Sequence, residues 1–157
     1  MIRLNRTTEY GLIALRHISR KNDSIPGEVT SAREIADCYG LPFEITAKTL
    51  QRLKETGLIH SAQGARGGYT LHRSLNDISL AEFLELMEGP QAVVLCASSE
   101  PDSHSPSCEY GGRCEIRGWM NALNHKILNF LSHIPLAELA LASPIEPRIF
   151  RGEEHAT

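Results

Sequence analysis

Two helix-forming segments joined by a short glycine turn constrain the fold of this 157-residue chain more than any other feature. The first segment opens at Ser31, where Glu34 completes a capping box in which each residue satisfies a first-turn donor of the other. Gly40 follows its end, and the second segment begins at Pro42, whose missing N–H costs nothing in a first turn. Gly57 stands where a left-handed cap ends a helix. This arrangement is typical of a helix-turn-helix.

A glycine-rich segment, Gly64-Ala65-Arg66-Gly67-Gly68, comes directly after these helices. Strand-like runs flank it at Leu58–Ala62 and Tyr69–His72. The glycines permit a positive φ and allow the backbone to approach a phosphate closely. The sequence therefore predicts a winged helix, in which this hairpin is the wing.

Hydrophobic periodicity and capping signals predict that the rest of the chain is mainly helical. The fold class we expect is mainly α with a small β-hairpin wing: a winged helix-turn-helix followed by a long C-terminal helix. The further predicted elements are a helix at about Thr7–Arg20, a loop at Asn22–Gly27, a helix from Ser79 to about Glu88 behind a second capping box, a long helix at about Ile116–Ser132 with a near-heptad apolar stripe, and one further turn at Leu136–Leu141.

The polar side chains of the second helix in the helix-turn-helix are candidate DNA contacts. We expect Phe43, Ala47, Leu50 and Leu53 to form its buried face. Residues near the start of such a helix meet base edges in the major groove: lysine donates to guanine, glutamate accepts from cytosine, and a threonine methyl meets thymine. An arginine at the wing tip suits a narrow minor groove or a phosphate. The alternative is a winged helix that binds protein. The predicted DNA contacts are Glu44, Thr46, Lys48, Thr49, Arg52 and Arg66.

Net charge is distributed unevenly along the chain. The whole carries −3, but residues 1–75 hold 11 Lys/Arg against 7 Asp/Glu, and residues 76–157 hold 5 against 12. A basic first half is what phosphate contact requires, and an acidic second half is repelled by DNA. We therefore assign DNA binding to residues 1–75.

Three of the four cysteines are clustered with the spacing Cys96-x11-Cys108-x5-Cys114. Thiolates select iron–sulfur clusters, zinc or copper(I). The paired C-x2–4-C knuckles typical of zinc are missing, and wide single-cysteine spacing suits an iron–sulfur cluster. Zinc with His104 as fourth ligand and three free thiols are the alternatives. Cys38, at the end of a helix, is expected to be a small buried hydrophobe.

Several motifs in order resemble the IscR/NsrR (Rrf2) family of bacterial winged-helix regulators. They are Arg3-Leu4, the run Thr8-Glu9-Tyr10-Gly11-Leu12 with Leu15, Ile35-Ala36, the run from Gly40 to Leu58, the wing Gly64-x-x-Gly67-Gly68-Tyr69 and the three cysteines. The resemblance covers about residues 1–140. It implies a homodimer joined by the long helix, an iron–sulfur cluster on the cysteines, and binding to a palindromic operator in double-stranded DNA that the cluster state controls.

The chain departs from this family in two places. The first cysteine gap holds eleven residues where about five are usual, and Arg117 stands where IscR-like members have a ligating histidine. NsrR-like members use an acidic residue near the start of the first helix of the partner subunit, and the matching position is Glu9. The resemblance thus implies Glu9 as fourth ligand and favours a 4Fe–4S over a 2Fe–2S cluster. The competing interpretation is that Glu9 only favours the positive end of its helix, and His104, within the longer cysteine gap, is the alternative fourth ligand.

These observations together predict a regulator, most simply a repressor, that senses nitric oxide, redox state or iron and cluster supply. The alternative is a cluster-free regulator whose cysteines bind zinc or act as thiol switches. We expect no enzyme activity, because no nucleophile elbow, P-loop or H-E-x-x-H motif is present. The charged start MIRLNRTTEY does not resemble a signal peptide, and no apolar run is long enough for a membrane span, so we expect a cytoplasmic protein. The predicted division is 1–75 for DNA binding, 76–142 for cluster and dimer, and 143–157 as a disordered tail.

Overall fold

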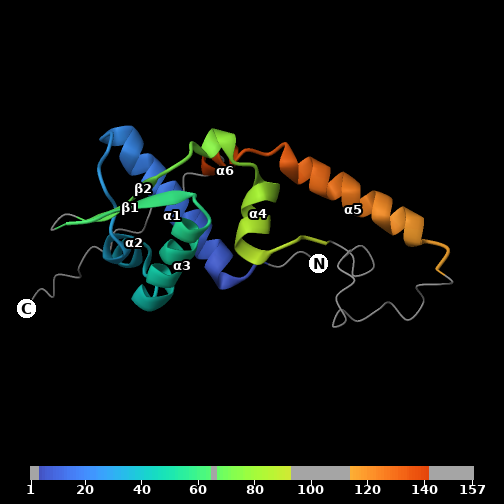
Figure 1. The fold of residues 1–157 in the computed structure, drawn as a ribbon, viewed down its shortest axis with the longest axis horizontal. Helices are drawn as coiled ribbons and strands as arrows, with labels where there is room; N and C mark the ends of the chain where they lie inside the picture. The colour runs from blue at the N-terminus through green and yellow to red at the C-terminus, as the bar shows by residue number, and fades with distance from the viewer. Residues whose placement is uncertain (1–3, 65–66, 93–113, 142–157) are drawn as a thin grey trace, which may run out of the picture.

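The computed structural model describes residues 4–64, 67–92 and 114–141 (Figure 1). Within these ranges the chain is mainly helical and carries one two-stranded antiparallel sheet, as the sequence predicts. The elements are α1 (Arg6–Ser24), α2 (Ala32–Tyr39), α3 (Phe43–Glu55), β1 (Ile59–Ala62), β2 (Gly68–Leu71), the 3-10 turn η1 (Leu75–Asp77), α4 (Leu80–Glu88), α5 (Arg117–Ser132) and α6 (Leu136–Leu141).

Helix α1 is longer than its sequence pattern suggests. It begins behind Asn5, whose side chain accepts a hydrogen bond from the Thr8 N–H at 2.8 Å. It continues to Ser24, so the predicted loop from Asn22 is wrong over its first three residues. The helix stops only at Ile25, which is extended because it precedes Pro26.

The helix-turn-helix is formed by α2 and α3. The Ser31 side chain accepts from the Glu34 N–H at 3.1 Å, which confirms the predicted cap. Gly40 has φ +64°, and the Leu41 N–H behind it donates to the Ala36 carbonyl at 2.9 Å. Gly57, after α3, has φ +74°. Both turns therefore require the left-handed region that glycine adopts without strain.

The wing pairs β1 with β2, with Ile59 opposite Leu71 and Ala62 opposite Gly68. Thr30, just before α2, exchanges two backbone hydrogen bonds with Tyr69 at 2.8 and 2.9 Å. A Cβ on Gly68 would lie 2.8 Å from the Thr30 carbonyl oxygen. Glycine is required at this position because the backbone of the preceding loop packs against the strand, and Gly68 itself needs no positive φ.

One hydrophobic core joins both halves of the chain. Leu15 and Ile18 of α1 pack with Leu50 of α3, Phe83 of α4 and Leu136 of α6. The backbones of the segment before α4 and the α5–α6 turn are also bonded, since Leu80 N–H donates to Ile134 and Leu136 N–H to Ile78. The core is therefore continuous across residue 75, and the division into two functional units stays a prediction.

Helix α5 extends outwards beyond α4 and away from α1, α2 and α3 (Figure 1). Several of its apolar side chains are exposed to solvent: Trp119 is 74% exposed, Phe130 66%, and Leu123 is exposed as well. Ile116, the residue just before the helix, is also exposed. Among the described residues of α5, only Asn124 is buried. Much of the predicted apolar stripe therefore faces away from the core of its own chain, although Leu131 at its end packs against that core.

Candidate DNA-binding face and cysteine site

Helix α3 presents its polar side to solvent along its whole length. Glu44, Lys48, Gln51 and Arg52 are exposed, as the sequence predicts for residues that meet DNA. Arg52 also donates to the Leu86 carbonyl at 3.1 Å, which ties α3 to α4. Glu44 and Lys48, in the first two turns, are therefore the polar side chains of α3 that are most available to DNA.

The expected exposure of Thr46 and Thr49 is wrong, because both are buried. Their hydroxyls donate to the carbonyls of Pro42 and Ile45 at 3.0 and 2.8 Å, four residues back along the helix. A threonine hydroxyl that is bonded in this way can be buried without leaving an unpaired donor. Burial removes both residues from the set that can reach a DNA base.

Phe43 was predicted in the buried face and is instead 42% exposed. Its ring lies under the guanidinium of Arg33, with the guanidinium carbon 4.4 Å from the ring centroid. Arg33 is on α2, ten residues earlier, and sequence reasoning did not single it out. The sequence does contain a basic residue on α2 and an aromatic residue at the start of α3. This pattern indicates a contact only once the fold is known.

A half-buried polar network fixes α2 against α1. Lys21 Nζ donates to both Glu34 carboxylate oxygens at 2.8 Å and to the Val29 carbonyl at 2.9 Å. His17 lies 3.1 Å from Glu34 through Nε2 and 3.2 Å from the Tyr39 hydroxyl through Nδ1. His17 thus packs and hydrogen-bonds within the fold.

The network shifts the titration of its members. Partial burial opposes ionisation of Glu34, but hydrogen bonds from Lys21 and His17 outweigh it and hold the pKa of Glu34 below its ordinary value. The hydrogen bond to Glu34 raises the pKa of Lys21. Burial raises the pKa of Tyr39. Lys21 and Glu34 are therefore both charged at neutral pH and attract each other across the α1–α2 contact.

The wing tip was expected to carry a DNA contact at Arg66, which lies outside the described residues. Its flank is defined: Gly64 has φ +125°, and the Gly67 N–H donates back to the Gly64 carbonyl at 2.9 Å. A Cβ on Gly67 would lie 2.8 Å from the Ala62 carbonyl oxygen. These glycines are needed for a tight turn at the end of the hairpin.

The proposed cluster ligands fall partly outside the described residues, since Cys96 and Cys108 belong to 93–113. Cys114 is a half-buried free thiol just before α5, and its carbonyl accepts from the Arg117 N–H at 3.3 Å. Cys38 on α2 is half-buried as well, more open than expected. Among the residues that the structure describes, no group of three or more His, Cys, Asp or Glu side chains could hold a metal ion.

Glu9 lies in the first turn of α1, where its exposed carboxylate is 3.9 Å from Arg6. At this distance and exposure the ion pair between Arg6 and Glu9 is weak. The Glu9 carboxylate therefore remains accessible to a group outside this chain. The helix start also contacts α4, because the Asn5 N–H donates to Glu88 at 2.9 Å. The donor chemistry of Cys114 and Glu9 suits iron, and both side chains reach the surface of the described part.

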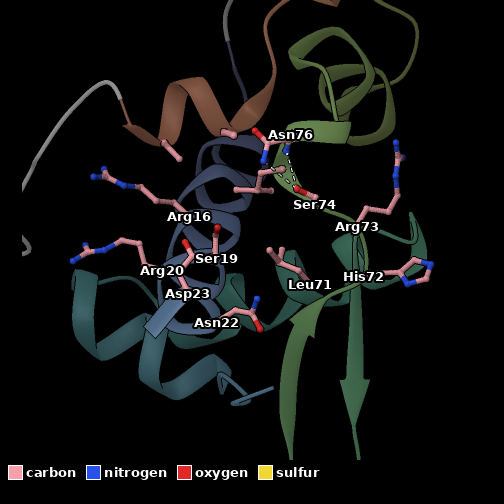
Figure 2. Close-up of a pocket in the computed structure, with 13 residues that line it drawn as sticks. Arg16, Ser19, Arg20, Asn22, Asp23, Leu71, His72, Arg73, Ser74 and Asn76 are labelled. Carbon is pink, nitrogen blue, oxygen red and sulfur yellow. Dashed lines mark hydrogen bonds between the residues drawn. The ribbon is translucent and has the colours of Figure 1, made fainter. Parts of the chain in front are cut away.

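A cavity of about 490 Å3 lies between α1, the segment 71–76 and α6 (Figure 2). Its polar side chains do not converge: Arg16 and Arg20 extend from α1 away from Leu71 and Ser74 (Figure 2). Arg73 is held by Glu82 and by the Asp77 carbonyl. The described residues around this cavity therefore provide no gathered set of charges for a small ligand.

The Rrf2 family model, described as an iron-dependent transcriptional regulator, matches residues 4–142. The chain belongs to the Rrf2 family. Proteins of this family are transcriptional regulators that bind DNA, so this chain is a regulator and not an enzyme. Among the described residues, no helix is long and apolar enough to cross a membrane.

Relatives of this Rrf2 protein include two with curated names. It is 26% identical over 146 residues to the transcriptional repressor NsrR of Streptomyces coelicolor, covering 93% of each chain. It is 25% identical over 138 residues to the transcriptional regulator IscR of Pectobacterium atrosepticum, covering 88% of this chain and 79% of that protein.

Solved structures confirm the fold. CymR, the global cysteine regulator of B. subtilis, matches with a TM-score of 0.66 at 23% identity, covering 89% of this chain and 97% of that one. IscR of T. potens matches with a TM-score of 0.62 at 20% identity, covering 88% and 85%. At these identities the likeness establishes the winged-helix fold alone.

Proposed function

We propose that this protein is a homodimeric repressor that binds a palindromic operator and senses nitric oxide, redox state or iron and cluster supply through an iron–sulfur cluster. The observation that carries the proposal is the Rrf2 match over residues 4–142, which spans both the helix-turn-helix and all three clustered cysteines. The family description, iron-dependent, supports an iron cofactor for these thiolates.

Cys96, Cys108 and Cys114 would hold the cluster, with Glu9 of the partner subunit as the fourth ligand. The exposure of Glu9 supports this role, because a carboxylate turned outwards on α1 is available to a second chain. A bound cluster with one carboxylate-ligated iron supplies a labile site that reacts with nitric oxide or oxygen. A single carboxylate beside three thiolates favours 4Fe–4S over 2Fe–2S.

Helix α1 would convey the state of the cluster to the DNA-binding face. Glu9 lies near its beginning, and Lys21, twelve residues on, holds α2 through Glu34. Between them, Ala14, Leu15 and Ile18 pack in the core with α3. Release of Glu9 would free α1 to shift, and α2 and α3 with it. A coupling of about 1–3 kcal/mol would change operator affinity roughly 5- to 150-fold.

Two copies would associate through α5, whose exposed Trp119, Leu123 and Phe130 need an apolar partner. The two α3 helices would then enter successive major grooves, since a two-fold dimer reads two half-sites. Glu44, Lys48 and Arg52 remain the proposed contacts on α3, and Arg66 on the wing.

The proposal is tested by anaerobic purification, followed by absorption spectroscopy and native mass spectrometry before and after nitric oxide. We expect a brown dimer whose mass includes iron and sulfide and whose colour is bleached by nitric oxide. Replacing any one of the three cysteines by serine should abolish the colour. A colourless protein that takes up no iron and sulfide on reconstitution would overturn the cluster.

Glu9→Ala tests the fourth ligand. We expect an altered cluster spectrum and faster reaction with nitric oxide, because the labile iron loses its carboxylate. Glu138→Ala is the matched control, since Glu138 is also an exposed carboxylate in the first turn of a helix. If Glu9→Ala leaves both the spectrum and the nitric oxide kinetics unchanged, Glu9 acts only on the helix dipole.

A cluster-free regulator with a zinc or thiol-switch site is the second candidate. It is favoured by the long cysteine gap, which contains His104. Its signature is a colourless protein that carries zinc, or one whose DNA affinity changes on reversible oxidation.

A further inference from the structure

Arg33 and Phe43 form a contact at the beginning of the helix-turn-helix that the proposed function has not used. Arg33 is the second residue of α2, and Phe43 is the first residue of α3. The guanidinium carbon lies 4.4 Å from the ring centroid, within the range of a cation–π interaction. Both side chains are exposed, so their contact with each other does not bury either of them in the core.

The partner of Arg33 differs from the partners of other cations on this half of the chain. Lys21 and Arg73 are paired with the carboxylates of Glu34 and Glu82. No carboxylate of the described residues lies within ion-pair distance of Arg33. A carboxylate neutralises an arginine and occupies its N–H donors, whereas an aromatic face orients the guanidinium and leaves its N–H fork free.

The exposure of Phe43 fits the same interpretation. An exposed phenylalanine at the first position of a recognition helix contributes little to the core, yet here it holds a charged neighbour in place. In a helix-turn-helix the first helix crosses the DNA backbone while the second enters the major groove. Arg33 is on that first helix, beside the end of α3 that carries Glu44 and Lys48.

We propose that Arg33 binds a phosphate of duplex DNA, and that Phe43 is the positioning residue that aims its guanidinium. This inference rests on the proposed DNA-binding face. A phosphate contact of this kind sets affinity and register and reads no base. It should therefore act equally on all sequences, which allows a test before any operator is known.

The test is fluorescence-anisotropy binding to a labelled 30-base-pair duplex of mixed sequence over a range of salt concentrations, with both cluster-loaded and cluster-free full-length protein. Arg33→Ala should weaken binding about tenfold per contact at low salt, or about a hundredfold per dimer, as for a lost hydrogen bond to a charged group in each subunit. The slope of log affinity against log salt should fall by about 0.9 per phosphate lost, or about 1.8 per dimer. Arg33→Lys should keep the slope and lose part of the affinity.

Arg20→Ala is the control, because it removes the same charged group from an exposed position on α1, outside the proposed DNA contacts and the proposed dimer face, and should leave the slope unchanged. A merely structural role for Arg33 would lower the unfolding midpoint in urea without changing the slope. Equal slopes for Arg33→Ala and the wild type would overturn the phosphate contact.

Phe43→Leu tests the positioning role of Phe43, since leucine keeps an apolar side chain and removes the aromatic face under the Arg33 guanidinium. It should weaken binding about two- to fivefold per subunit in the wild type, or about five- to thirtyfold per dimer, the range expected for two solvent-exposed cation–π contacts. In the Arg33→Ala background it should have no further effect. Equal losses in both backgrounds would overturn the positioning role. Wild-type protein that binds no duplex in either cluster state would instead overturn the DNA-binding face itself.

Discussion

Glu34→Gln is the substitution that best tests how α2 is held on α1. Glutamine keeps the size and shape of the side chain but removes its charge. In the wild type, the Glu34 carboxylate accepts two hydrogen bonds from Lys21 at 2.8 Å and lies 3.1 Å from His17. The variant can keep one hydrogen bond from the Lys21 ammonium to its amide oxygen, so the loss reports the attraction between the two charges and the second hydrogen bond.

The magnitude follows from the strength of each kind of bond. The lost attraction of a partly exposed ion pair contributes roughly 0.2–1 kcal/mol, and the lost second hydrogen bond roughly 1 kcal/mol. The side chains of Lys21 and Glu34 are 21% and 35% exposed, so water screens part of the difference. We expect a loss of about 1 kcal/mol in the free energy of unfolding, equivalent to about 2–4 °C in Tm for a chain of this size.

The loss should depend on pH in a defined window. Because the folded pKa of Glu34 is lowered, its contribution is present above the ordinary value of 4.5 and is lost as pH falls through the lower folded value. Because the folded pKa of Lys21 is raised, its contribution is present below 10.5 and is lost as pH rises through the raised value. The difference between wild type and variant should therefore be constant from about pH 6 to 9 and shrink in acid.

Urea unfolding followed by circular dichroism measures this difference at fixed protein concentration, which matters because a dimer's stability depends on it. Lys21→Met and the double variant complete a cycle that isolates the pairwise term. Glu28→Gln is the control: Glu28 lies 3.5 Å from Lys21 and is 39% exposed, so we expect at most about 0.3 kcal/mol. Equal stabilities of Glu34→Gln and wild type at pH 7, or a difference that does not shrink in acid, would refute the reasoning.

Two further substitutions test the wing and the long helix. Gly68→Ala should lower stability by about 1–3 kcal/mol, because the new methyl would meet the Thr30 backbone and break its bonds to Tyr69; an unchanged urea midpoint would contradict this. Phe130→Glu should convert the proposed dimer to a monomer in sedimentation velocity, whereas Asn129→Glu, with the same charge at a neighbouring exposed position, should stay dimeric; a dimeric Phe130→Glu would exclude this part of α5 from the interface.

Local signals in the sequence were sufficient to predict the beginnings and ends of most helices. Ser31 and Ser79 cap α2 and α4 as expected, because a side-chain oxygen two or three positions before free N–H groups needs no tertiary partner. Gly40 and Gly57 adopt positive φ for an equally local reason. The wing could also be predicted from local sequence, since a hairpin is determined by its turn residues and by the alternation of apolar and polar residues on either side.

The buried face of α3 could not be predicted from polarity. Thr46 and Thr49 are polar by composition, yet each satisfies its hydroxyl within the helix and is buried. Phe43 is apolar, yet it lies at the first turn, beyond the core, and packs under Arg33. Residue hydrophobicity describes the transfer of an isolated side chain. It omits the carbonyls of the helix itself, which satisfy the two threonines, and the guanidinium of a neighbouring helix, which covers Phe43.

The candidate cluster site was beyond local reasoning for another reason. Cysteine spacing along one chain indicates which thiolates can share a cluster, but a ligand from a second subunit leaves no spacing signal. Glu9 was reached only through resemblance to a family, and its exposed position in α1 is compatible with the role without testing it.

Helix α1 combines two kinds of contact that suit a connecting element. Its middle turns pack through apolar side chains, and Gly11 allows Phe83 and Met87 of α4 to approach closely. Apolar contacts fix distance but tolerate small sliding movements. The polar contact between Lys21 and Glu34 has directional hydrogen bonds and fixes the register of α2. Glu9 and Lys21 are about 18 Å apart along a helix that rises 1.5 Å per residue. If Glu9 binds the proposed cluster, a small displacement at its end of α1 would slide this helix over α4 while α2 follows it without slipping.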